Sequence, residues 1–236
     1  GIPYIEVAKT GVCGIIKGTK EGKNKTIALR GDIDALPIQD MKTCEFKSKV
    51  DGKMHACGHD AHTTILMGAA KLLNEHKNEF SGTVKLLFEP AEETTGGAPD
   101  MITQGVLENP RVDCVLGLHV DEETECGTIK IKKGVVNAAS NPFSIKITGQ
   151  GGHGASPHTT VDPVVIASHI VIALQTVVSR EIAPVNPAVI TVGTLHAGTA
   201  QNIIPGEATL SGMIRTMTKE DRAFAIQRLN EIVNGI

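Results

Sequence analysis

The first half of the chain alternates short apolar runs with longer stretches of helical spacing. Apolar runs typical of buried strands occupy residues 26–30, 84–88 and 113–119. Residues 63–76 and 99–107 instead carry their apolar side chains at the spacing of one helix face. Because strands alternate with helices, we predict an α/β fold with a mostly parallel sheet covered by helices.

After about residue 127 the pattern of elements changes. Strands are predicted over 142–148, 188–196 and 207–216, and helices over 162–181 and 218–233. The resulting order, β-α-β-β-α, lacks only the last strand of the ferredoxin-like β-α-β-β-α-β unit. A sheet cut at this point would leave an unpaired edge, so we expect the chain to be a fragment of a longer protein.

This change marks a predicted domain boundary. We expect a first domain over residues 1–127 and a second domain, incomplete at its C-terminus, over 128–236. The chain has 236 residues, of which 41% are hydrophobic, so a proper core can form. The net charge is −3, Trp is absent and Tyr occurs once. Without a basic stripe or an aromatic platform, a nucleic-acid partner is not expected.

The longest apolar stretch and the cysteines bear on location. Residues 164–178 include Ser168, His169 and Gln175 and fall short of the ~20 residues that a bilayer span requires. We therefore expect a packed helix and no membrane partner. Five scattered cysteines, with Cys114 inside an apolar run, indicate buried thiols in a reducing compartment. We expect the protein to be cytoplasmic.

Candidate chemistry is concentrated in residues 54–62, which contain Cys57 and three histidines. Such density is typical of metal ligation or of proton transfer by histidine. Cys57 and His59 are too close in sequence for the Cys-x2-Cys arrangement of structural zinc sites. His59 alone could be an ordinary hydrogen-bonded residue at a helix start. With Cys57, Glu93 and His119 as partners, metal ligation is favoured, and His55 and His62 are expected to orient ligands or to be structural.

Two further groups of candidate ligands end later apolar runs. Glu92 and Glu93 follow the run at 84–88 and Pro90, and His119 ends the run at 113–119. Open α/β sheets build their sites at the carboxyl ends of their strands, so these groups are expected to converge. Two adjacent acids in a loop are usually solvated charge. After a buried strand, however, one carboxylate can bind a metal while its neighbour acts as general base toward metal-bound water.

Five motifs in this order resemble the amidohydrolase branch of the dinuclear metallopeptidases: HACGHDAHT, FEPAEE, LGLHV, GGHGASPH and NIIPGEATLSGMIRT. That branch contains N-acyl-amino-acid hydrolases, hippurate hydrolases and plant auxin-conjugate hydrolases. The resemblance covers nearly the whole chain. It implies two divalent metal ions per subunit, of Zn, Mn, Co or Ni, held by Cys57, His59, Glu93 and His119. Glu92 matches the base that activates the nucleophilic water.

The resemblance also assigns roles in the second domain, which it identifies as an inserted lid and dimerisation domain. His153 matches a histidine that polarises the scissile carbonyl and stabilises its oxyanion, usually across a homodimer interface. Asn202 and Arg215 match residues that hold the substrate carboxylate, a role that suits the planar guanidinium of arginine. Without the resemblance, Arg215 would be an ordinary surface charge and His153 a turn residue.

The chain departs from the family pattern in two places. Related peptidases carry a ligating His-x-Asp where this chain has Asp32-Ile33-Asp34, a change that the amidohydrolase branch shares. We therefore expect Asp34 to orient ligands or to be structural. The family's last metal ligand is a histidine that would lie beyond Ile236.

The sequence therefore predicts a metal-dependent enzyme that hydrolyses the amide bond of N-acyl or N-aryl-acyl amino acids, small molecules from which it releases a carboxylic acid and a free amino acid. The isolated fragment is expected to be inactive. The alternative is a non-catalytic metal-binding or dimerisation module, a degenerate or truncated relative.

Overall fold

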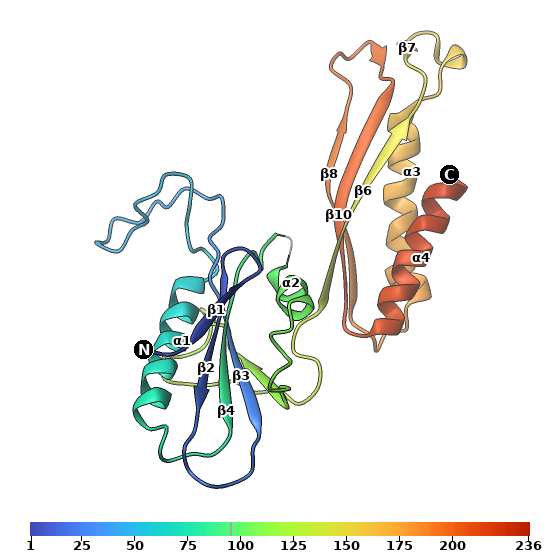
Figure 1. Cartoon of the computed structure of the whole chain (residues 1–236). Helices are drawn as coiled ribbons and strands as arrows, with labels where there is room; N and C mark the ends of the chain where they lie inside the picture. Colours follow the sequence, from blue (N-terminus) through green and yellow to red (C-terminus); the bar gives the residue numbers. More distant parts are fainter. Residues whose placement is uncertain (95) are drawn as a thin grey trace. The chain divides into compact units, whose positions relative to one another are not determined.

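The computed structural model describes residues 1–94 and 96–236. The chain forms two compact units, residues 1–128 and 129–236, and each is described by itself (Figure 1). The first unit contains the Cys/His cluster and both glutamates. The second contains His153, Asn202 and Arg215.

The first unit is built on a five-stranded sheet of order β1-β2-β4-β3-β5. Its strands are β1 (Tyr4–Val7), β2 (Gly11–Lys17), β3 (Thr26–Asp32), β4 (Thr83–Glu89) and β5 (Cys114–Gly117). Strand β3 is parallel to β4 and β5, whereas the pairs β1–β2 and β2–β4 are antiparallel. The sheet is therefore mixed, and the expectation of a mostly parallel sheet is not confirmed.

Two helices accompany this sheet, α1 (His59–Glu75) and α2 (Gly97–Thr103). Leu66 of α1 packs in one core cluster with Leu86 of β4, and Met101 of α2 packs in another with Leu87. Successive side chains of a strand point to opposite faces, so the two clusters lie on the two faces of β4. This explains why five of the seven residues of β4 are buried.

Helix α1 begins four residues before the predicted start and so includes part of the Cys/His cluster. Gly58 precedes it with a φ of 80°, a left-handed conformation that favours glycine. The first turn contains His59, Asp60 and His62. Apolar periodicity does not mark this turn, because these polar side chains serve the site and not the core.

The second unit has a three-stranded antiparallel sheet of order β6-β10-β8. Its main elements, in chain order, are β6 (Ala139–Thr148), α3 (Pro163–Thr176), the π-helical turn η2 (Val177–Glu181), β8 (Ala188–Ala197), β10 (Glu207–Thr216) and α4 (Lys219–Gly235). The order β-α-β-β-α is as predicted. The short pair β7 (Gly152–His153) and β9 (Ile203–Ile204) and the 3-10 turn η1 (Pro157–Thr159) were not predicted.

Both long helices of this unit start at the caps that their sequences indicate. Asp162 accepts a hydrogen bond from Val164 N at 2.8 Å, and Thr218 accepts one from Asp221 N at 3.0 Å. A capping oxygen satisfies a backbone N–H that the first turn leaves without a partner. The helices cover one core in which Leu174 and Leu210 are almost completely buried.

One helical segment in the described part of the chain, Pro163–Glu181, is long and apolar enough to cross a membrane by length and composition alone. Core helices of other proteins meet the same criteria. Here Ala167, Ile170 and Leu174 are buried in the core of the second unit, whereas Ile172 is 67% exposed.

The cysteines correct one expectation. All five are free thiols in the described structure, but only Cys13 is buried, and Cys114 and Cys126 are exposed. Cys114 begins β5, which lies at the edge of the sheet and exposes Val115 and Leu116 as well. An apolar run on an edge strand therefore did not imply burial.

Candidate metal centre

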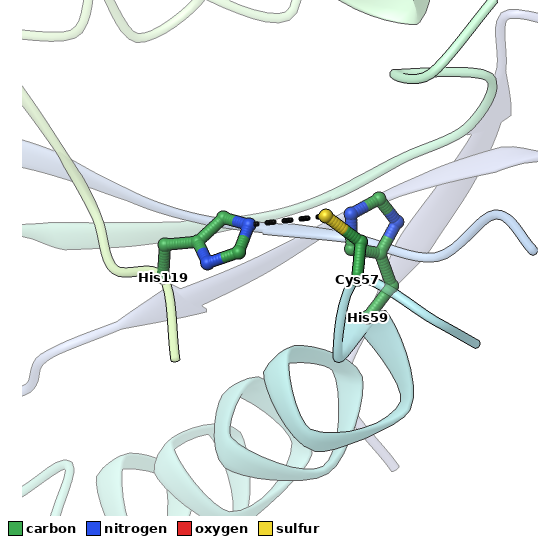
Figure 2. A group of neighbouring side chains, drawn as sticks. All are labelled: Cys57, His59 and His119. Carbon is green, nitrogen blue, oxygen red and sulfur yellow. Dashed lines mark hydrogen bonds between the residues drawn. The ribbon is translucent and has the colours of Figure 1, made fainter. Parts of the chain in front are cut away.

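The predicted ligands of the first unit converge although they come from three separate segments. Cys57 and His59 lie at the start of α1, Glu93 follows β4 and His119 follows β5. The Cys57 Sγ atom is 3.6 Å from His119 Nε2, and Figure 2 shows the thiol pointing toward that ring. His59 Nε2 is 3.8 Å from Glu93 Oε1. The carboxyl ends of the parallel strands β3, β4 and β5 lie at the same edge of the sheet, which brings these residues together.

Donor atoms form two overlapping groups in which all members lie within 4.8 Å of one another. One group is Cys57, His59 and His119, and the other is His59, Glu92 and Glu93. His59 belongs to both groups. The set of one thiol, two imidazoles and two carboxylates can hold divalent transition metals.

Hydrogen bonds fix which nitrogen of each imidazole is available. His59 Nδ1 lies 3.0 Å from the carbonyl oxygen of Asp34, and His119 Nδ1 lies 2.6 Å from that of Val120. A carbonyl oxygen only accepts, so both Nδ1 atoms carry the proton and donate. In the neutral rings both Nε2 atoms then carry the lone pair, the arrangement of metal-binding histidines, and that of His119 faces the Cys57 thiol.

Two buried atoms at the centre have no hydrogen-bond partner among the described residues, namely His59 Nε2 and Glu93 Oε1. Both are acceptors when His59 is neutral, so they cannot satisfy each other. Buried polar atoms are almost always paired, and an unpaired pair of this kind requires an explanation. A divalent cation bound to both atoms would satisfy them, so these residues fit a metal.

The raised pKa values of Cys57 and Glu92 also indicate a site suited to a cation. A hydrogen bond with Glu93, burial and the charges of Glu93 and Glu92 raise the pKa of the Cys57 thiol to about 11. Burial and the charge of Glu93 raise the pKa of Glu92. The site thus concentrates negative charge. Bound cations reverse this effect and deprotonate a coordinating thiol.

A third group of possible ligands, Asp32, His59 and His62, is completely buried. His62, however, has both nitrogens engaged: Nδ1 donates to Asp32 Oδ1 at 2.6 Å, and Nε2 accepts from Val120 N at 2.8 Å. Asp32 Oδ2 accepts from Arg30 at 2.7 Å. Burial raises the pKa of Asp32, but the hydrogen bond from His62 and the charge of Arg30 lower it by more, so that this pKa lies below its ordinary value.

The other polar residues near the cluster hold the candidate ligands in place. The Asp34 carbonyl oxygen also lies 3.1 Å from His55 Nδ1, and Asp34 Oδ2 accepts from Glu93 N at 3.1 Å. Asp34 thus contacts both His59 and Glu93. Sequence reasoning did not identify Arg30, Asp32 and Glu89 as a buried network. Charged residues within and just after the apolar run at 26–30 were the available signal.

In the second unit, His153 and Asn202 are neighbours. His153 pairs with Ile203 across β7 and β9, and Gly154 N donates to Asn202 O at 2.9 Å. A Cβ atom at Gly154 would come within 3.0 Å of that oxygen, so glycine permits the approach. Ala155 N donates to His153 Nδ1 at 3.1 Å, which leaves the proton on Nε2. His153 can therefore donate a hydrogen bond from Nε2.

Arg215 lies at the opposite end of this unit's sheet. β7 lies beside the end where β10 begins, since Gly149 N donates to Gly206 O (Figure 1). Eight residues of extended strand separate Glu207 from Arg215, which corresponds to roughly 26 Å at ~3.3 Å per residue. One unit therefore does not bring Asn202 and Arg215 together.

The comparison with protein families decides the affiliation. The family described as peptidase family M20/M25/M40 matches residues 28–232. The chain belongs to this family. Similar proteins include IAA-amino acid hydrolase ILR1-like 4 of Arabidopsis thaliana. It is 46% identical over 234 residues, which are 99% of this chain and 52% of the relative. The N-acetylcysteine deacetylase of Bacillus subtilis is 43% identical over 228 residues, 97% of this chain and 59% of the relative.

A solved M20 structure resembles the chain as well. It is the Bacillus subtilis YXEP protein, described as a dinuclear metal binding peptidase, with a TM-score of 0.78 and 38% identity over 99% of this chain and 59% of that one. The chain thus spans about half to three fifths of the length of these M20 proteins. The family and this structure support the binding of divalent metal ions.

Proposed function

We propose that this chain belongs to an amidohydrolase that uses two divalent cations to cleave N-acyl amino acids. The observation that carries the proposal is the pair of buried, unpaired acceptors, His59 Nε2 and Glu93 Oε1, beside the converging Cys57 and His119. The names of the similar IAA-amino acid hydrolase and N-acetylcysteine deacetylase support amide-linked N-acyl amino acids as the substrate class.

In this proposal Cys57, His59, Glu93 and His119 hold the ions, which are Zn, Mn, Co or Ni. Bound divalent ions polarise the substrate carbonyl and lower the pKa of bound water. The residues of the chain perform the remaining work. Asp34 orients His59 and Glu93 through the hydrogen bonds described above.

Glu92 is the proposed general base. It takes a proton from the nucleophilic water, whose oxygen forms a bond to the amide carbonyl carbon. It then returns that proton to the nitrogen as the C–N bond breaks. A carboxylic acid and a free amino acid result, and no further reactant is needed. Its neighbour Glu93 contributes the ligand, which leaves the Glu92 carboxylate available for proton transfer.

His153 is proposed to donate its Nε2 proton in a hydrogen bond to the carbonyl oxygen as negative charge develops there. Asn202 and Arg215 are proposed to bind the substrate carboxylate. Because they lie at opposite ends of one unit, a single carboxylate requires that one of them comes from a second copy. This separation supports a homodimer formed through residues 129–236, the proposed lid. Five free thiols favour a reducing, cytoplasmic environment.

Substitution of the base tests the proposal in the full protein. We expect Glu92→Gln to abolish hydrolysis of N-acetyl and N-benzoyl amino acids while metal content stays at the wild-type two equivalents. Glu75→Gln, at an exposed carboxylate of α1, is the matched control and should retain activity. Normal turnover by Glu92→Gln would refute the base assignment. One equivalent of metal or none in the wild type, without turnover, would favour the non-catalytic module.

A further inference from the structure

His119 is the most exposed of the candidate ligands, yet the residue after it is held from two sides. His62 Nε2 accepts a hydrogen bond from Val120 N at 2.8 Å. The Val120 side chain lies against Gly58, where a Cβ atom would come within 2.3 Å of Val120 Cγ2. Val120 therefore attaches the His119 segment to the turn that carries Cys57 and His59.

His62 can make this contact because its other nitrogen is fixed. Asp32 Oδ1 accepts from His62 Nδ1 at 2.6 Å, which leaves Nε2 as an acceptor toward Val120. Asp32 is in turn held by Arg30, and Arg30 Nε donates to Glu89 Oε2 at 2.6 Å. The chain Glu89–Arg30–Asp32–His62 runs from two parallel strands to α1, and Asp32 and His62 are 1% and 2% exposed.

The rings of the histidines are also in contact. The centroids of His62 and His119 are 4.6 Å apart with an interplanar angle of 67°. His62 thus touches the His119 ring and holds the backbone next to it. A hydrogen-bonded backbone and a packed ring together restrict where His119 Nε2 can point.

We propose that His62 is a positioning residue, which sets His119 against Cys57 and His59 through the Val120 N–H and does not itself bind the metal. The inference rests on the proposed function, since it concerns the ligand geometry of that same site. Asp32 and His62, which together with His59 form the third group of possible ligands, thus support His119 and do not bind metal themselves.

Two conservative substitutions separate the two hydrogen bonds of His62. The amide oxygen of Gln reaches the position of Nε2 and can accept from Val120 N. The amide nitrogen of Asn reaches the position of Nδ1 and can donate to Asp32, but Asn is too short to reach Val120. His76→Gln, at an exposed histidine that follows α1, is the matched control for the chemical change.

Two quantities are measured. The first is amide hydrogen exchange at Val120 in the metal-free protein. The second is Cd²⁺ affinity, from a titration monitored by the charge-transfer absorbance of thiolate-bound Cd²⁺, with Cys57→Ser as the background. We expect His62→Asn to lose Val120 protection and to weaken Cd²⁺ binding by about 10–100-fold. His62→Gln should retain protection and bind more tightly than His62→Asn. All variants should keep the wild-type metal stoichiometry, and His76→Gln should behave like wild type.

Loss of one metal equivalent in both His62 variants would show that His62 is a ligand and would overturn the inference. Equal protection and affinity in Asn, Gln and wild type would overturn it as well. The failure of the proposed function looks different, because the wild type itself would then give no thiolate–Cd²⁺ absorbance. In that case Val120 exchange still decides whether His62 holds the His119 segment.

Discussion

Gly58 offers a quantitative test of the contact between Val120 and the turn that carries the ligands. In Gly58→Ala, the new Cβ atom would lie 2.3 Å from Val120 Cγ2, and the residue would keep a φ of 80°. A non-glycine residue in this left-handed region costs about 1–2 kcal/mol. Relief of the clash moves Val120 away from His62, and the buried His62 acceptor that is then left without its partner costs about 1–3 kcal/mol.

The expected loss in free energy of unfolding is therefore roughly 2–5 kcal/mol, measured by urea denaturation. Gly52→Ala is the matched control, because Gly52 has a φ of 68° but nothing within 4 Å of an added Cβ atom. It should show only the backbone cost. In the double variant Gly58→Ala/Val120→Ala, the clashing Cγ2 atom is absent. The extra loss of unfolding free energy that Gly58→Ala shows relative to Gly52→Ala should then largely disappear.

A loss at Gly58 no larger than the loss at Gly52 would refute the reasoning. So would a double variant in which the two losses simply add, because sites that do not interact are additive. The Val120→Ala single variant is required to complete the cycle.

Two further predictions concern other parts of the first unit. The backbone N–H groups of Ser48 and Lys42 donate to Asp40 and lower its pKa from the ordinary value of 3.8, so the ionised carboxylate stabilises the loop around it. The difference in unfolding free energy between wild type and Asp40→Asn should therefore shrink as the pH falls below 3.8. A difference that stays constant to the acid limit would contradict this. Lys85 is 2% exposed, and its ammonium group donates to the carbonyl oxygens of Val106 and Glu108. Lys85→Met should therefore lower the free energy of unfolding, measured in urea, by about 1–3 kcal/mol for each carbonyl left unpaired. An unchanged urea midpoint would show that these hydrogen bonds contribute nothing.

Apolar patterning predicted those elements whose side chains meet a core. The predicted strand 207–216 coincides with β10, because its alternating residues Ala208, Leu210 and Ile214 are buried. Strands β1 and β2 were missed: β1 has four mostly exposed residues, and β2 begins with Gly11 and has its apolar run interrupted by Gly14. Their antiparallel pairing is the reason that the sheet is mixed.

The sequence also indicated which donors would meet, since Cys57 precedes a helix start and Glu93 and His119 follow the ends of strands that a parallel arrangement brings together. It could not indicate that Val120 connects two of these segments. That contact depends on a backbone N–H, which every residue except proline has, and on the left-handed Gly58 beneath the valine. Nor could spacing reveal that His153 lies next to Asn202, because that depends on the pairing of β7 with β9, two short strands that were not predicted.

Anomalous diffraction from crystals of the protein grown with Zn²⁺ or Mn²⁺ tests the central claim most directly. The account predicts peaks bonded to the Cys57 sulfur, the Nε2 atoms of His59 and His119, and a Glu93 oxygen, with metal–ligand distances of about 2.0–2.3 Å for zinc. His62 and Glu92 should lie outside the coordination sphere. Ions bound to Asp32 and His62 instead, or no ion between these donors, would contradict the account.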